Sequence, residues 1–340
     1  MRKGTTLWKG RLFGMLALLV CFSLLSLLVA CLVGSASMEW QSLPSAFFEL
    51  LRGEPASLTA TLLQLRLQRL FAAFLTGCSL ALAGVMMQAL LRNPLADPYI
   101  LGVSGGASVG ALFMLFVGGM VWMVHAAALT GAVAVAILLY GLVRRELGQN
   151  ANTDGSTQLL LTGVVLALGC GAVITLLLSI ASDGHLRGMV FWLVGDLEGA
   201  DMNWLSVLVL ITVMACMFRM ARSINLLALH SEEAVALGVN VALVRKALFF
   251  CGALLTACAV TNAGSIGFVG LVVPHFCRMT FGADHRLLLP AATLAGGSFL
   301  VLADLLARVL FMPHQLPVGA VTALIGVPVF LFQLYRFRAN

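Results

Sequence analysis

The stretch LFGMLALLVCFSLLSLLVACLVG, residues 12–34, is a run of 23 residues without a single charge. A helix needs about 20 apolar residues to cross the roughly 30 Å hydrocarbon core of a bilayer, so this run predicts a membrane span. Basic residues precede it, as they do in a secretory signal peptide: Arg2, Lys3, Lys9 and Arg11. The apolar core of a signal peptide has only about 7–15 residues, and we therefore interpret the run as a retained first span.

Similar apolar runs fill the rest of the chain. Of its 340 residues, 61% are hydrophobic and 10% are charged, and the mean hydropathy is +1.04. Average soluble domains have about 25% charged residues, so the sequence predicts an all-α integral membrane protein. Residues 1–340 are expected to form a single transmembrane domain. Charges and Gly/Pro clusters divide it into about ten spans, near residues 12–34, 62–91, 97–116, 120–143, 157–181, 203–220, 244–264, 267–281, 287–310 and 317–335.

The lysines and arginines lie mostly on one side of the predicted membrane. With the N-terminus inside, 15 of the 20 basic residues fall on the cytoplasmic side, and the even number of spans returns the C-terminus to that side. An excess of basic residues in cytoplasmic loops is the usual pattern, which supports this orientation. The basic residues stand singly or in pairs rather than in a patch, so a nucleic-acid partner is not expected.

An internal repeat divides the chain into two halves. LTGC at residues 75–78 recurs as LTAC at 255–258, an offset of 180 residues, and each copy leads to an Ala-Gly pair and then to a short broken span. Five spans separate the copies, so they cross the membrane in opposite directions. Inverted-topology halves, roughly 12–181 and 203–335, with corresponding broken spans are typical of transporters.

The long cytoplasmic loop, residues 221–246, contains the stretch LHSEEAVALGVN. Ser231 can cap a short helix that has Glu232 and Glu233 in its first turn, and Gly238 can end that helix in a left-handed conformation. We interpret this helix as a docking element for a soluble motor, the alternative being an ordinary surface loop. The chain has no G-x-x-x-x-G-K-[ST] motif, so ATP would be bound by a separate subunit.

The residues Gly102 to Gly106 spell G-x-S-x-G, which in hydrolases places a nucleophilic serine on a tight turn. Ser104 and His275 could form the dyad of a rhomboid-like intramembrane protease, which is the alternative from another functional class. The chain has more spans than such proteases have, and Pro94 and Pro98 interrupt the helix before the motif. We therefore expect no catalytic residue here, and Ser104 to be dispensable.

Candidate metal ligands and ion-coupling residues are few. The eight cysteines form no C-x-x-C pair and lie in or beside apolar runs, so no metal site is expected. Asp304 is the one mid-span carboxylate that an ion-coupled carrier could use. Arg308 follows four residues later and can pair with Asp304 along one helix face, which favours a structural role.

Several long motifs resemble one family over nearly the whole chain. They are RNPLADPYILGVSGGASVGA, HSEEAVALGVN, GSIGFVGLVVPHFCRM, ADHRLLLPAATLAGGSFLVLADLLARVL and LPVGAVTALIGVPVFLF. Together they resemble the FecCD or BtuC-like permease subunit of type II ABC importers for iron-siderophores, haem and cobalamin. The resemblance implies a non-enzymatic permease of the bacterial inner membrane that works by alternating access and has no cofactor of its own. Its implied partners are two cytoplasmic ATPase subunits, a periplasmic binding protein and a second permease, identical or paralogous.

The resemblance also assigns roles to residues. The docking residues for the binding protein would be Arg66, Arg69 and Arg308. The cytoplasmic gate would comprise Asn93, Leu95, Ser156 and Thr157, although the longer loop at 148–158 leaves the gate positions open. The ATPase-coupling helix would include Ser231, Glu232, Glu233, Ala234, Leu237 and Gly238. No residue identifies the cargo; ferric siderophore is expected first, because it is the commonest in the family, with cobalamin and haem as alternatives.

Overall fold

The computed structural model describes residues 2–34, 40–53, 55–148, 155–200, 203–229, 231–312 and 314–339, and all regular structure in these ranges is helical. Seven helices there are long and apolar enough to cross a membrane: α1 (Arg2–Leu32), α3 (Leu58–Leu91), α5 (Val121–Gly148), α6 (Gly155–Ile180), α8 (Trp204–Leu229), α10 (Val241–Ala263) and α12 (His285–Val309). Three shorter apolar helices accompany them: α4 (Val103–Phe116), α11 (Val269–Phe281) and α13 (Val318–Ala339). These helices correspond one for one to the predicted spans, which confirms the all-α membrane fold.

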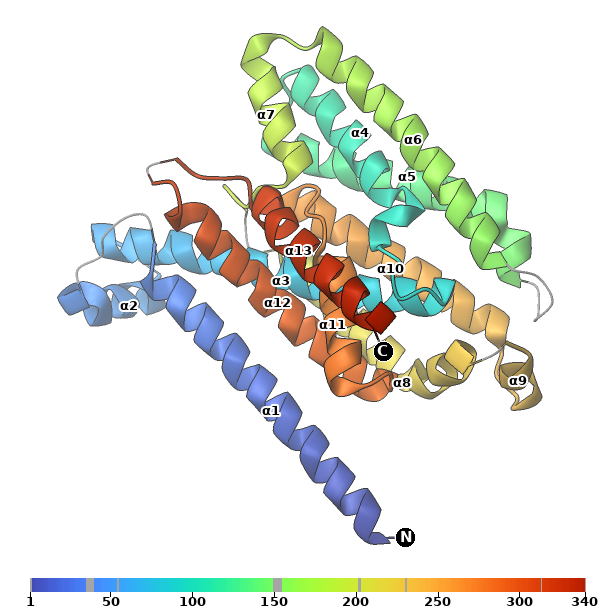
Figure 1. Cartoon of the computed structure of the whole chain (residues 1–340). Helices are drawn as coiled ribbons and strands as arrows, with labels where there is room; N and C mark the ends of the chain where they lie inside the picture. The colour runs from blue at the N-terminus through green and yellow to red at the C-terminus, as the bar shows by residue number, and fades with distance from the viewer. Residues whose placement is uncertain are drawn as a thin grey trace.

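Three further helices lie outside the spans: α2 (Leu43–Arg52), α7 (Asp183–Val194) and α9 (Ser231–Ala236). Only α9 was predicted from the sequence. Helices α2 and α9 lie at opposite ends of the helical bundle (Figure 1), which we call the α2 end and the α9 end. The α2 end therefore corresponds to the predicted outer side, and the α9 end to the predicted cytoplasmic side.

Helix α3 is the most enclosed of the spans, with 89% of its most apolar window buried. Helices α10, α11 and α12 pack against it, and small side chains permit their close approach. A Cβ atom on Gly77 would overlap the carbonyl oxygen of Gly296 in α12. One on Gly84 would overlap the carbonyl oxygen of Gly270 in α11. The core of the molecule is therefore built on backbone-to-backbone contacts around α3.

The two halves of the chain share an order of helices. In each half a long span that carries the repeated sequence, α3 or α10, is followed by a short span, α4 or α11. Both short helices begin after a residue with left-handed backbone geometry, Gly102 with φ +72° and Phe268 with φ +69°. Before α4, Pro98–Leu101 form a turn of 3₁₀-helix. The predicted break before each short span is thus confirmed.

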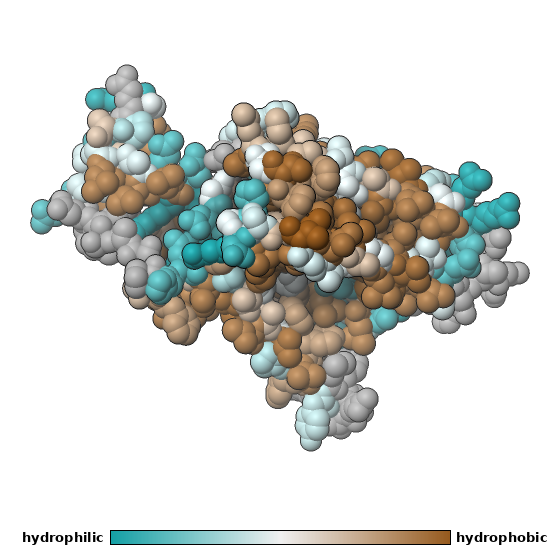
Figure 2. Space-filling view, turned by 90° about the horizontal axis from the view of Figure 1, so that it is seen from above, coloured by the Kyte–Doolittle hydropathy of each residue, from teal (hydrophilic) through white to brown (hydrophobic). Residues whose placement is uncertain are grey.

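Apolar side chains cover much of the surface. Figure 2 shows them across the middle of one face, with hydrophilic residues gathered toward the ends. Helix α6 is the extreme case, because only 11% of its apolar window is buried in this chain. Leu161, Leu168 and Leu176 of α6 are each more than 60% exposed. Such a surface suits lipid or another membrane subunit rather than water.

Candidate docking, gate and coupling sites

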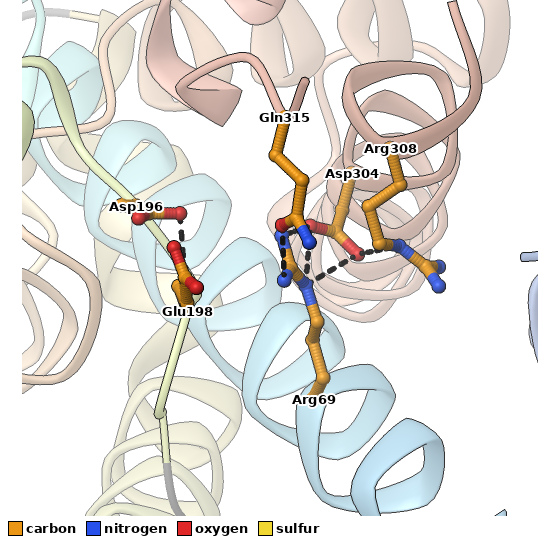
Figure 3. Close-up of polar contacts among 6 residues, drawn as sticks. All are labelled: Arg69, Asp196, Glu198, Asp304, Arg308 and Gln315. Carbon is orange, nitrogen blue, oxygen red and sulfur yellow. Dashed lines mark hydrogen bonds and ion pairs between the residues drawn. The ribbon is translucent and has the colours of Figure 1, made fainter. Parts of the chain in front are cut away.

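Asp304 lies near the α2 end of α12, fully buried between two arginines (Figure 3). Its Oδ1 is 2.9 Å from Nη2 of Arg69 and accepts from Nε of the same residue at 3.0 Å. Its Oδ2 is 3.0 Å from Nε of Arg308, one turn further along the helix. Arg69 also donates from Nη1 to Oε1 of Gln315 at 3.0 Å. The predicted pair of Asp304 and Arg308 is confirmed, and a second cation, not predicted, shares the carboxylate.

Arg66 is held differently from the other two predicted docking arginines. Its Nη1 donates to the carbonyl oxygens of Cys31 and Leu32 at 3.0 and 3.2 Å. These are the last carbonyls of α1, which lack partners within the helix, and a cation there also opposes the negative end of the helix dipole. Arg66 therefore joins the start of α3 to the end of α1.

All three arginines line one cavity of about 390 Å³ at the α2 end. Glu198 lines it from the opposite wall, in a turn where its backbone N–H donates to Oδ1 of Asp196 at 3.1 Å (Figure 3). Nη2 of Arg308 is buried and has no hydrogen-bond partner among the described residues. The three guanidinium groups give the wall of the cavity a positive charge, and docking of a partner here stays a prediction.

The predicted gate residues Asn93 and Leu95 lie in the turn that joins α3 to α4. Oδ1 of Asn93 accepts from the backbone N–H of Leu95 at 2.9 Å, and its carbonyl accepts from Ala96 N–H at 3.1 Å. Arg92 ends α3 in a left-handed conformation with φ +48°. Asn93 therefore shapes the turn, and Leu95 is left 40% exposed at its tip.

Ser156 and Thr157, the other predicted gate residues, lie in the first turn of α6. The side chain of Thr157 is exposed, whereas that of Ser156 and residues 149–154 of the preceding loop lie outside the described part. A Cβ atom on Gly163 of α6 would overlap the carbonyl oxygen of Ile100, so the turn before α4 packs on α6. The two gate segments thus belong to neighbouring elements, and their gating role stays a prediction.

A cavity with several polar side chains in its wall, which sequence reasoning missed, adjoins the gate turn. It has a volume of about 270 Å³ and is lined by Gln88, Arg92, Pro94, His275 and Arg278, among others. Gln88 is buried in α3, where its Nε2 donates to Leu271 O at 3.3 Å and its Oε1 accepts from Arg278 at 3.5 Å. Gln88 is the one amide or charged residue in the sequence between Arg69 and Arg92, and this was the available signal.

The predicted coupling segment forms helix α9 and the turn after it. Gly238 has φ +81°, as expected for a left-handed helix end, and its N–H donates to the carbonyl of Val235 at 2.9 Å. Ala234 is fully buried whereas Leu237 is 66% exposed. Ser231 and Glu232 begin the helix, and their side chains lie outside the described part; Glu233, also in this turn, is exposed. One face of the segment is therefore buried against the protein, and the opposite face is exposed at the α9 end.

Ser104, the nucleophile of the alternative protease interpretation, is buried in the first turn of α4, where its carbonyl accepts from Oγ of Ser108 at 2.9 Å. The ring of His275, in α11, packs against Phe330, with ring centroids 6.1 Å apart. The neighbouring glycines serve packing, since a Cβ on Gly106 would overlap the carbonyl oxygen of Gly131 in α5. Within the described ranges, no cluster of three potential metal ligands occurs either.

The ten apolar helices, with paired breaks and charged residues at their ends, define a polytopic membrane permease. The chain belongs to the FecCD transport family, whose family model matches residues 17–336. Permeases of this family are transport subunits without catalytic activity of their own.

Several known proteins are similar to this chain over most of its length. It is 38% identical over 325 residues to the vitamin B12 import system permease protein BtuC of Shigella boydii, covering 94% of this chain and 95% of that one. BtuC of Escherichia coli gives the same values. A solved inward-facing metal-chelate type ABC transporter is 31% identical, with a TM-score of 0.79, and covers 96% of this chain and 99% of its own. PsaBC from Streptococcus pneumoniae, at 14% identity and a TM-score of 0.54, shares the fold alone.

Proposed function

We propose that this chain is the permease subunit of an ATP-driven importer that moves a bulky metal chelate across the bacterial inner membrane. The observation that carries the proposal is the match to the FecCD transport family over residues 17–336. The chain lacks a phosphate-binding loop, so ATP binding by separate cytoplasmic subunits would bias two arrangements of the helices. In the orientation predicted from the basic residues of the loops, both termini would lie in the cytoplasm.

The two ends of the molecule offer different partner sites. At the α9 end, the exposed side of the coupling segment, including Leu237, would contact the ATPase. At the α2 end, the cavity lined by Arg66, Arg69 and Arg308 would receive carboxylates of a periplasmic binding protein. The gate at Asn93, Leu95, Ser156 and Thr157 would close the path on the cytoplasmic side.

A second permease subunit, identical or paralogous, would complete the path. Helix α6 supports this assignment because its apolar side chains have few partners within the chain. The remaining apolar surface would contact lipid.

Cobalamin is the cargo that we propose first, because the similar full-length proteins at 38% identity are vitamin B12 permeases. Ferric siderophore, which was expected from the sequence resemblance, lacks support from these relatives, and haem stands beside it as an alternative.

Uptake into proteoliposomes tests this function. The permease would be reconstituted with its ATPase and binding protein, and accumulation of labelled cobalamin, ferric siderophore and haem would be compared. We expect cobalamin accumulation that requires ATP and is absent with a hydrolysis-deficient ATPase. Accumulation driven by a proton gradient without ATP would contradict the importer assignment, whereas ATP-dependent uptake of ferric siderophore alone would change only the cargo.

A further inference from the structure

A polar cluster at the α9 end joins α8 to α12. Asn225, near the end of α8, donates from Nδ2 to Oδ1 of Asp284 at 2.7 Å. Its Oδ1 accepts from the backbone N–H of His285 at 2.9 Å and lies 2.6 Å from Nδ1 of the same residue. Asp284 is the N-cap residue of α12, and His285 is its first residue. One amide side chain thus bonds to three groups at the start of another helix.

These hydrogen bonds leave the side chains of the Asn225 cluster little conformational freedom. Because Oδ1 of Asn225 can only accept, Nδ1 of His285 must carry a hydrogen, and the orientation of the amide is fixed by its donor to the carboxylate. Oδ1 of Asp284 also accepts from Arg286 N–H at 3.0 Å, which caps α12. The imidazole of His285 is only 1% exposed. A buried and mutually oriented set of hydrogen bonds of this kind holds two helix ends in one relative position.

Each of the two joined helices leads to a different predicted site. Helix α8 leads into the coupling segment and packs against α9. Helix α12 has 25 residues and is therefore about 37 Å long; Asp304 and Arg308 lie toward its far end, where Arg308 lines the predicted docking cavity. In the described part of the chain, the Asn225 cluster is the one place where side-chain hydrogen bonds connect α8 with α12. The Asn225 cluster therefore connects the helix that leads to the coupling segment with the helix that carries Asp304 and Arg308.

We infer that Asn225 is a positioning residue that couples the ATPase-contact segment to α12, so that docking at the α2 end and ATP turnover at the α9 end influence each other. The inference rests on the proposed function. A movement of the end of α8 would be transmitted to α12 through the amide, and α12 carries Asp304, which holds Arg69 of α3. Coupling of this kind between binding of the binding protein and binding of nucleotide is reciprocal by thermodynamic necessity, whereas the effect on the ATPase rate need not be symmetric.

The test uses the complete transporter in nanodiscs, with its ATPase and binding protein. Two ratios are measured: the ATPase rate with and without the binding protein, and the Kd for the binding protein with and without a non-hydrolysable ATP analogue. In Asn225→Ala both ratios should be closer to one: the effect of the binding protein on the ATPase rate and the effect of the ATP analogue on the Kd should each be about fivefold or more smaller than in the wild type. The basal ATPase rate and the nucleotide-free Kd should stay within about twofold of wild type, because the variant leaves both contact sites intact.

Asn203→Ala is the matched control. Asn203 lies directly before the first residue of α8, and its Nδ2 donates to Oδ1 of Asn262 in α10 at 3.3 Å rather than to a residue of α12. It should retain both ratios. Asn225→Asp keeps an acceptor for His285 but places a second carboxylate against Asp284, so it should lose coupling as well. Adding Asp284→Asn to that variant restores a donor and acceptor pair and should restore the ratios.

The outcomes separate the inference from the proposed function. A wild-type transporter that neither binds an ATPase nor responds to a binding protein would overturn both. If the wild type responds and both Asn225 variants keep its ratios, then Asn225 is not a coupling residue. A loss of thermal stability with unchanged ratios would likewise assign Asn225 a purely structural role and overturn the inference. Loss of coupling in Asn225→Asp with recovery in the double variant supports it.

Discussion

Arg69 can be changed without leaving a buried charge unpaired, which makes it the best test of the docking cavity. In Arg69→Gln, Asp304 keeps Arg308 as its partner at 3.0 Å, so the fold should persist. Loss of a charge-assisted donor should raise the Kd for the binding protein about tenfold, or about 1.4 kcal/mol, and should reduce its salt dependence. Both are measured by titration at several salt concentrations.

The control for this prediction is Arg187→Gln. Arg187 lies on α7, on the same predicted side of the membrane, and its guanidinium sits 5.6 Å from the ring of Phe191 rather than in the arginine cavity. This variant should bind the binding protein like the wild type. An unchanged Kd for Arg69→Gln at low salt would remove Arg69 from the docking surface.

Asp97, in the turn before α4, should make stability depend on pH. Burial raises the pKa of its carboxyl to about 6, although the hydrogen bond from Tyr99 N–H at 2.7 Å acts in the opposite direction. The folded state therefore disfavours the ionised form, so stability falls as pH rises from about 4 through 6. Asp97→Asn keeps the acceptor and removes the charge. Its gain in thermal midpoint over wild type should grow between pH 5 and 7, and a constant difference would contradict the assignment.

At the residue scale, the sequence predicts contacts within an element and misses those between distant elements. The spacing of four between Asp304 and Arg308 predicts their pairing, because such residues share a helix face. Arg69 is 235 residues away from Asp304, and no local pattern reveals that they meet. The same holds for Asn225 and His285, which are 60 residues apart and bind across two helices.

At the scale of elements, the contact between α3 and α11 depends on Gly84. In Gly84→Ala the new methyl group would overlap the carbonyl oxygen of Gly270, a backbone atom that cannot rotate away. We expect a loss of about 1–3 kcal/mol or more from overpacking, seen as a lower thermal midpoint and poorer monodispersity in detergent. Gly141→Ala in α5 is the control, because nothing lies within 4 Å of its added Cβ. It should be neutral or slightly stabilising, since alanine favours helix.

Helices with long apolar runs or clear breaks were predictable, as was α9 from its caps, whereas the short helices α2 and α7 were not. The 3₁₀ turn at Pro98–Leu101 and the start of α4 follow from proline and glycine placement. Helices α2 and α7 are short and lie beside spans, so apolar length gives no signal for them. The Pro44 near the start of α2 and the left-handed Gly53 after it, with φ +77°, were the local signals available.

At the scale of the whole molecule, the predicted inverted arrangement of the two halves determines which loops should face each side of the membrane. Alkaline phosphatase is active only outside the cytoplasm, and green fluorescent protein exported in unfolded form does not fluoresce. A fusion after Gly199 follows α1, α3, α4, α5 and α6, which is an odd number of apolar helices, and should have phosphatase activity. A fusion after Gly238 also includes α8 and should fluoresce instead.

The physical basis of the fusion prediction is the unequal distribution of basic residues between the α2 end and the α9 end of the molecule. Arg92, Arg145, Arg222 and Arg245 flank spans at the α9 end, where the positive-inside rule places the cytoplasm. The short apolar helix α4 is decisive, because Val103–Phe116 has only 14 residues and must cross as a broken span within the protein rather than alone in lipid. If α4 does not cross, the fusion after Gly199 would fluoresce and the fusion after Gly238 would show phosphatase activity. That reversal would place the coupling segment outside the cell, away from any ATPase, and would contradict both the inverted topology and the proposed function.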